Sequence, residues 1–151
     1  MKLAEALQER ADLNRSIEQL SSRLASNALV QEGETTAEDP SELLTQLDAA
    51  AARLEELMAR INLTNCKTLD ADGVSITELI AKKDCLRLKL NAYKTLAYEA
   101  SQTARRASRT EIKVMSAVDV RRLQKEVDRL SAELRRTDNA IQALNWSTEL
   151  L

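Results

Sequence analysis

The chain has few side chains of the kinds that carry out catalysis. Its 151 residues include no His and only two Cys, Cys66 and Cys85. Without His, the chain can form neither a Ser–His nor a Cys–His nucleophile pair, and it has no imidazole to offer a metal ion. The two thiols stand too far apart in sequence for a Cys-x-x-Cys redox pair. We therefore expect a protein that is not an enzyme and that uses no cofactor.

Carboxylates offer two routes to a metal site, and neither is favoured. Asp70 and Asp72 before Gly73 resemble the start of a calcium-binding loop, but Leu79 stands where such a loop needs Glu. A turn in which Gly73 has a positive φ explains the same residues. An all-carboxylate site between facing helices stays open as an alternative, although di-iron bundles normally use Glu-x-x-His motifs.

Several charged residues occupy positions at which an ion pair with another helix or segment is expected. Lys83 falls in a row of apolar residues, where a charge is costly unless it is paired. We expect it to reach an acidic group from the first or second predicted helix, within the chain or across a subunit boundary, or else to extend to water. Arg105, Arg106 and Arg109 form a basic connector that we expect to pair with the acidic segment 32–39 or with the end of another helix.

The chain has three aromatic residues, and Trp146 is the only Trp. It follows the last apolar residue of the predicted fourth helix. The preferred interpretation is that it fastens the C-terminal tail to the protein, and a binding hot spot is the alternative. So few aromatic residues disfavour single-stranded nucleic acid as a partner, because such binding depends on base stacking.

Four long helices are predicted to position these side chains. Two Gly, one Pro and 30% charged residues are typical of coiled coils and long-helix bundles. Apolar residues recur at steps of three and four, which indicates amphipathic helices. Asp39 before Pro40, and Ser75 three residues before Glu78, are helix start signals. The helices are predicted at about residues 2–28, 40–64, 76–104 and 117–145.

The helix predicted at 76–104 has two apolar sides. Beside its main seam runs a second line of apolar residues, and a helix of this kind is normally buried by more than one neighbour. We therefore expect this helix at the centre of an assembly and a homo-oligomer as the functional form, either a dimer or something larger. The second line consists of Ala81, Cys85, Leu88, Ala92 and Leu96.

The predicted fold class is all-α. We expect an elongated antiparallel four-helix bundle or coiled-coil helices in a single domain, residues 1–151. The alternation of polar and apolar residues over 111–115 leaves room for a short β patch at one end, formed with residues 68–75.

The net charge of −2 hides an uneven distribution. Residues 1–75 have 7 basic and 14 acidic side chains, whereas residues 76–151 have 15 and 10. We expect the two halves to attract each other, within or between subunits, and we expect no nucleic-acid partner. The N-terminus has no apolar core of a signal peptide, and no stretch is apolar enough to cross a bilayer. A cytoplasmic protein without a membrane partner is therefore expected.

A set of short motifs is distributed over nearly the whole chain. The motifs are Glu32-Gly33, Asp39-Pro40, Arg60-Ile61-Asn62 with Asn65, Asp72-Gly73, Thr77-Glu78, Asp84-x-Leu86, Ile141-Gln142, Asn145-Trp146 and Leu150. On these motifs the chain resembles the small bacterial proteins labelled septicolysin. The resemblance implies a helical, bacterial, cytoplasmic protein without an established activity, and the cytolysin label by itself is no ground for a toxin function.

Taken together, the residues predict a non-catalytic, self-assembling helical scaffold or interaction protein, whose partner is a second copy of itself or another protein. The alternatives are a membrane-active, cytolysin-like protein and a carboxylate metal-binding bundle. The residues expected to make the interactions are Lys83, Cys85, Leu88, Leu96, Arg105, Arg106, Arg109 and Trp146.

Overall fold

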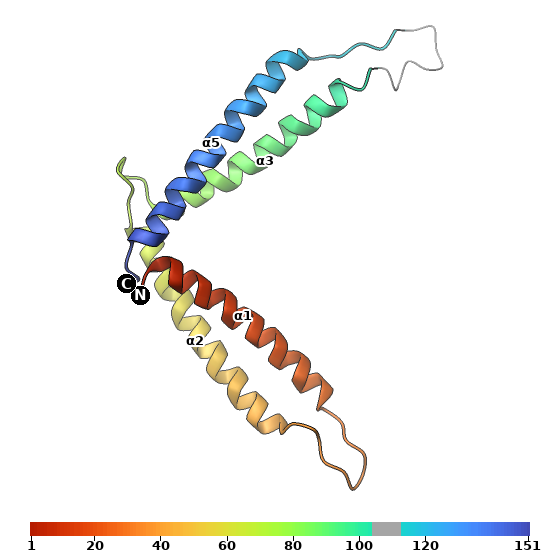
Figure 1. The fold of residues 1–151 in the computed structure, drawn as a ribbon, viewed down its shortest axis with the longest axis vertical. Helices are drawn as coiled ribbons and strands as arrows, with labels where there is room; N and C mark the ends of the chain where they lie inside the picture. Colours follow the sequence, from red (N-terminus) through yellow and green to blue (C-terminus); the bar gives the residue numbers. More distant parts are fainter. Residues whose placement is uncertain (104–112) are drawn as a thin grey trace. The chain divides into compact units, whose positions relative to one another are not determined.

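A computed structural model describes residues 1–103 and 113–151 and confirms the all-α fold class. In these residues there is no strand, only isolated bridges (Figure 1). The chain divides into two compact units: unit 1 comprises residues 1–69 and 144–151, and unit 2 comprises residues 70–143. The predicted packing of all four helices in one bundle stays a prediction. The helices are α1 (Leu3–Ser26), α2 (Pro40–Lys67), α3 (Ile76–Ala100) and α5 (Val120–Ser147).

Two helices begin where the start signals predict. At α2, the Asp39 carboxylate accepts a hydrogen bond from the Ser41 amide at 2.8 Å, and Pro40 occupies the first turn. At α3, Ser75 and Glu78 form a reciprocal capping box, with the Glu78 carboxylate 2.8 Å from the Ser75 amide. These hydrogen bonds hold the pKa of Glu78 below its usual range.

The other helix ends differ from prediction by one to four residues, and two of them have a clear local reason. The predicted start of the last helix at 117 is too early, because Asp119 is the cap and accepts from the Arg122 amide at 3.0 Å. The first helix ends at Ser26 because the Asn27 side chain donates to the Arg23 carbonyl and accepts from the Glu38 amide. That pair of bonds satisfies a carbonyl of the last helical turn and fixes the loop to α2.

In unit 1, α1 and α2 lie antiparallel and side by side (Figure 1). Arg53 of α2 forms an ion pair with Glu9 of α1, with Nε 2.7 Å from Oε1. This guanidinium lowers the pKa of Glu9. Apolar residues from both helices fill the seam between them: Leu3, Ala6, Leu20, Leu43, Leu57 and Ile61 are all buried.

The C-terminal tail completes unit 1 by pairing with the N-terminus. The Leu3 amide donates to the Thr148 carbonyl, and the Leu150 amide donates to the Met1 carbonyl, each at 2.9 Å. The Leu151 amide then donates to Oγ1 of the fully buried Thr64 at 3.1 Å. We call this set of bonds between residues 1–3, Thr64 and residues 148–151 the terminal clasp. It places both chain ends beside each other (Figure 1).

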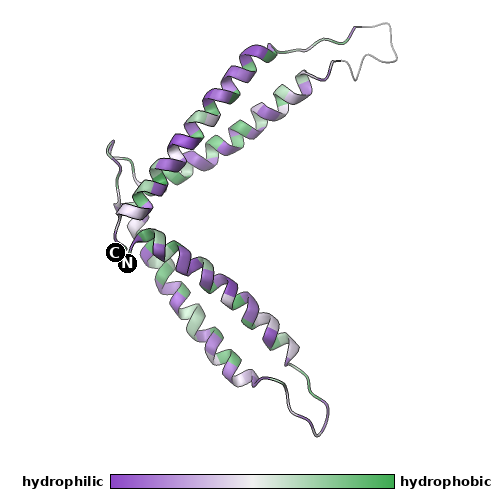
Figure 2. Cartoon of the chain, viewed as in Figure 1, coloured by the Kyte–Doolittle hydropathy of each residue, from purple (hydrophilic) through white to green (hydrophobic). Residues whose placement is uncertain are grey.

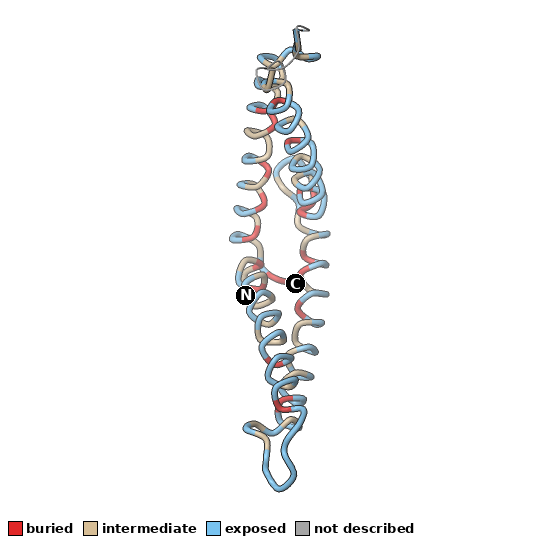
Figure 3. Tube along the Cα trace, turned by 90° about the vertical axis from the view of Figure 1, so that its right-hand side faces the viewer, coloured by how far each residue is buried: buried red, intermediate tan, exposed pale blue. Residues whose placement is uncertain are grey.

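In unit 2, α3 and α5 lie antiparallel over a narrow apolar core (Figure 1). Buried residues recur at intervals along the helices with exposed residues between them (Figure 3), and hydrophobic residues alternate with hydrophilic ones in the same way (Figure 2). A two-helix unit therefore covers only one side of each helix. Its core contains Leu90, Val127 and Leu130, with Leu86, Tyr93 and Leu134 packed against them.

The turn before α3 is confirmed, but the predicted β patch is wrong. The Asp70 amide donates to the Val74 carbonyl at 2.9 Å, and Gly73 adopts φ +79°. In the described part of segment 111–115, residues 113–115 form no strand. They lie beyond the C-terminal end of α3, whereas the turn lies before its N-terminal end. A helix of 25 residues separates its two ends by roughly 37 Å, so the two segments cannot pair.

Candidate interaction surface

The second apolar line of α3 is an exposed surface in unit 2. Neither α5 nor the described loops of this unit cover it. The Leu88 side chain is 71% exposed and that of Leu96 is 45% exposed, and the three smaller residues are exposed as well. We call this line the α3 stripe; it consists of Ala81, Cys85, Leu88, Ala92 and Leu96.

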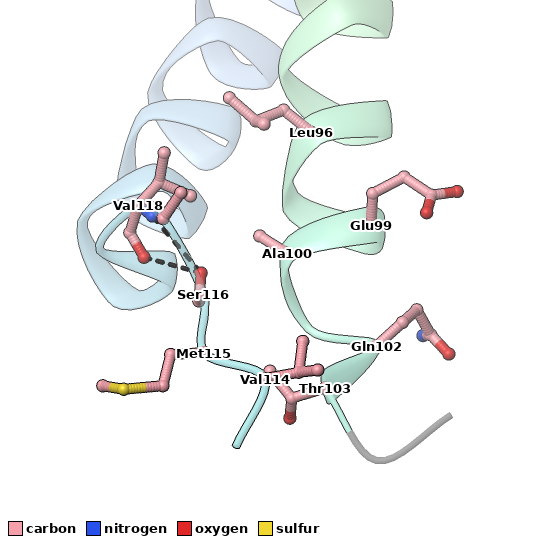
Figure 4. Close-up of a pocket in the computed structure, with 10 residues that line it drawn as sticks. Leu96, Glu99, Ala100, Gln102, Thr103, Val114, Met115, Ser116 and Val118 are labelled. Atoms are coloured by element: carbon pink, nitrogen blue, oxygen red, sulfur yellow. Dashed lines mark hydrogen bonds between the residues drawn. The ribbon is translucent and has the colours of Figure 1, made fainter. Parts of the chain in front are cut away.

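The α3 stripe ends in an open hollow where α3 faces the segment that leads into α5. The hollow has a volume of about 220 Å³ and is lined mainly by apolar atoms (Figure 4). Leu96 belongs to both the stripe and the hollow, and Met115 on the opposite wall is 73% exposed. Ser116 shapes this wall, because its hydroxyl donates to the Val118 carbonyl at 2.8 Å. The stripe and the hollow therefore form one continuous apolar surface.

Lys83 is paired, but not as predicted. Its Nζ lies 2.6 Å from Oδ1 of Asp138, which belongs to α5 of the same chain. The predictions of a partner on the first or second helix, and of a side chain extended to water, are therefore wrong. Lys82 next to it reaches Glu133 of α5 at 3.2 Å, and this hydrogen bond lowers the pKa of Glu133. Both lysines thus tie α3 to α5 by ion pairs.

Trp146 is 65% exposed, and the terminal clasp rather than the indole fastens the tail. The indole lines an open hollow with one face of α1, including Glu5, Glu9 and Asp12. These carboxylates already have partners. Glu5 accepts from the Lys2 amide at 2.7 Å, Glu9 binds Arg53, and Asp12 binds Arg15. The hollow therefore offers an exposed aromatic ring beside carboxylates of which two, Glu9 and Asp12, are neutralised by arginines.

The basic connector Arg105, Arg106 and Arg109 lies outside the described residues. Its predicted acidic partner segment, residues 32–39, is described in unit 1. There Glu38 forms an ion pair with Arg23 at the end of α1, which lowers the pKa of Glu38. One carboxylate of the acidic segment is thus already engaged within unit 1.

Two features of this surface were missed from the sequence. Asp138 follows the seam residue Thr137 on the last helix, and such flanking positions of a heptad often form ion pairs between helices, which was the available signal. The far wall of the hollow is formed by Val114, Met115 and Val118, and the sequence pattern predicts a strand over the first two.

Two further properties concern metal ions and membranes. In residues 1–103 and 113–151, no group of three or more Asp, Glu or Cys side chains is arranged to hold a metal ion. None of the helices in the same residues has both the length and the apolar character of a membrane span.

The chain is similar to proteins whose function is unknown. Residues 10–150 match the model of a family of unknown function, DUF6847. The crystal structure of a functionally unknown conserved protein from Corynebacterium diphtheriae has a TM-score of 0.91 and 38% sequence identity to this chain. The similarity covers 100% of this chain and 99% of that one. No curated protein matches. The resemblance to proteins labelled septicolysin stays a prediction, and the chain belongs to the DUF6847 family.

Proposed function

We propose that the protein is a non-catalytic helical scaffold that assembles with further copies of itself. The observation that carries this proposal is the α3 stripe, in which Leu88 is 71% exposed on the side of α3 that faces away from its seam with α5. Apolar residues at steps of three and four are the pattern by which helices recognise each other. A stripe of this kind on an otherwise charged helix is a second seam that has no partner in its own unit.

Burial energies support an interaction at this surface. Burying one Leu side chain contributes about 1.5–3 kcal/mol relative to leaving it exposed. Burial of Leu88 and Leu96 against a partner would therefore stabilise an assembly, and this free energy is not gained while the two side chains stay exposed to water. Monomeric proteins rarely expose contiguous apolar surface without a functional reason, and here the stripe continues into the hollow at the end of unit 2.

The cytoplasm is the proposed location. Cys66 and Cys85 are both exposed, and neither forms a disulfide. An exposed thiol such as that of Cys85 suits a reducing compartment, because in an oxidising one it would form disulfides between molecules. Cys85 lies in the α3 stripe, so assembly would also shield this thiol.

Size-exclusion chromatography with light scattering tests the proposal. We expect a discrete multiple of 16.8 kDa for the unmodified chain. Leu88→Glu places a carboxylate in the stripe and is expected to lower the mass toward that of one chain. Leu63→Glu is the matched control, because Leu63 is 46% exposed on α2, outside the stripe and outside the seam of unit 1. Circular dichroism should show equal helix content in all three proteins. An unchanged mass in Leu88→Glu would contradict the proposal.

A further inference from the structure

A second exposed apolar row lies on α2 in unit 1. Leu44 is 49% exposed and Met58 is 44% exposed, and Ala51 between them is exposed as well. The three residues are spaced by seven, so they lie above one another on one side of the helix. The seam residues Leu43, Leu57 and Ile61 are buried beside them. We call Leu44, Ala51 and Met58 the α2 flank.

The α2 flank has side chains complementary in size to a row of α3 that includes Ala81 and Leu88 of the stripe. The flank reads large, small, large at intervals of seven residues. On α3, residues at the same spacing of seven are Ala81, Leu88 and Thr95, and their side chains are small, large and small. If Leu88 lies opposite Ala51, each large side chain of one helix faces a small one of the other. This alternation is how knobs fill holes between packed helices.

The charges beside the two rows are complementary as well. On α2, Asp48 and Glu55 each precede a flank residue by three positions. On α3, Lys82 and Lys89 each precede a stripe residue by three positions. These flanking positions are the ones that form ion pairs between coiled-coil helices. Because both pairs lie on the same side of their rows, they meet at one edge when the two helices run antiparallel.

The units as a whole have opposite charge. Unit 1 has 7 basic and 13 acidic side chains, and unit 2 has 15 basic and 11 acidic ones. Opposite net charge favours the approach of unit 1 of one molecule to unit 2 of another over the approach of two like units. The partner best matched to the α3 stripe in charge is therefore a copy of unit 1.

We propose that the α2 flank of one molecule docks antiparallel onto the α3 stripe of a second molecule, with Ala51 opposite Leu88. The inference rests on the proposed self-assembly and names the surface that covers the stripe. In this register, Met58 lies opposite Ala81 and Leu44 opposite Thr95. Asp48 then faces Lys89, and Glu55 faces Lys82, whose side chain is 52% exposed and bound on its other side to Glu133. A reciprocal exchange between two molecules closes a dimer, whereas a one-way contact builds a longer chain.

The native thiol in the stripe provides the test. One protein, Cys66→Ser, keeps Cys85 as its single cysteine. The other carries Ala51→Cys with Cys66→Ser and Cys85→Ser, so that its single cysteine lies in the α2 flank. The two are mixed, left to exchange, and treated with a short bismaleimide that links neighbouring thiols. Isotope labelling of one protein identifies the mixed product by mass spectrometry.

The matched control is Ala49→Cys in the same cysteine-replaced background. Ala49 is, like Ala51, an exposed residue of α2, but it lies on a different side of the helix, away from the flank. We expect several-fold more mixed product with a cysteine at 51 than with one at 49.

The other outcomes separate this inference from the proposed function. If light scattering shows an oligomer while positions 51 and 49 link equally, the pairing with α2 is overturned and the self-assembly stands. If the Cys66→Ser protein links mainly to itself through Cys85, the stripe pairs with a second stripe and the inference is overturned. A third protein carries Ala51→Cys and Cys66→Ser and keeps Cys85, so that both thiols are in one chain. If the bismaleimide links these two thiols only within one chain, the inference is overturned as well. A monomer under all conditions overturns both proposals.

Discussion

Nζ of Lys83 lies 2.6 Å from Oδ1 of Asp138, so the charged residue in the seam of α3 is neutralised by α5 of the same chain. The Lys83 side chain is 23% exposed and that of Asp138 is 43% exposed. Because the pair is satisfied inside unit 2, it does not require another subunit. Partner choice in an assembly must therefore come from other residues.

This ion pair predicts unequal effects of removing its two members. Asp138→Ala leaves an unpaired ammonium group in the seam and should lower the free energy of unfolding by about 1 kcal/mol. Lys83→Leu replaces the charge with an apolar side chain and should keep or raise stability. Urea unfolding of the two single variants and the double variant forms a double-mutant cycle, which measures the interaction energy between Lys83 and Asp138. Equal losses in the two single variants would contradict the account, as would a change of solution mass in Lys83→Leu.

The Glu9–Arg53 ion pair predicts how the stability of unit 1 depends on pH. The hydrogen bond from Arg53 lowers the pKa of Glu9 in the folded chain below the ordinary value of 4.5. Stability from a lowered carboxyl pKa is present above the unfolded pKa and is lost as the pH falls through the folded one. Unfolding by urea should therefore become easier as the pH falls below about 4.5. Glu9→Gln should be less stable at neutral pH and should show a smaller loss on acidification; an identical pH profile would contradict this.

The terminal clasp predicts a specific role for Thr64. Its Oγ1 donates to the Arg60 carbonyl at 2.8 Å and accepts from the Leu151 amide at 3.1 Å, and the residue is fully buried. Thr64→Val keeps the shape and removes both bonds, so it should cost about 1 kcal/mol of stability. Thr64→Ser keeps the hydroxyl and serves as the control for hydrogen bonding. Amide hydrogen exchange at Leu150 and Leu151 should speed up in Thr64→Val alone, and equal exchange in all three proteins would argue against the clasp.

The exposure of Trp146 predicts its fluorescence. Because the indole is 65% exposed, its emission should be close to that of free Trp in water, and iodide should quench it readily. Trp146→Phe should leave the free energy of unfolding within about 0.5 kcal/mol of the unmodified chain, as is usual for surface substitutions. A blue-shifted, poorly quenched spectrum would show instead that the indole is covered.

The features predicted correctly from the sequence are those determined by residues that lie close together in the sequence. Asp39 with Pro40 and Ser75 with Glu78 start helices because a side chain satisfies amides two or three positions away. Seam residues such as Leu57 and Leu130 are buried because their spacing matches the helical period. These signals depend only on local geometry.

The features that were missed depend on the register between distant segments. The pairing of Lys83 with Asp138 requires knowing which turn of α5 faces which turn of α3. Within the terminal clasp, residues 1–3 and 148–150 lie nearly a whole chain length apart in sequence and are joined through backbone groups, which carry no sequence signature. The α2 flank is not evident from the sequence, because Leu44 and Met58 directly follow Leu43 and Leu57, which belong to the buried seam of the same helix.

Self-assembly through the α3 stripe is the central claim, and the solution mass of the unmodified chain tests it most directly. Light scattering across a concentration series at low and at high salt should give a stable multiple of 16.8 kDa at low salt. If opposite charges hold the copies together, high salt should shift part of the population to a smaller species. A single species of 16.8 kDa at every concentration and salt would contradict the claim.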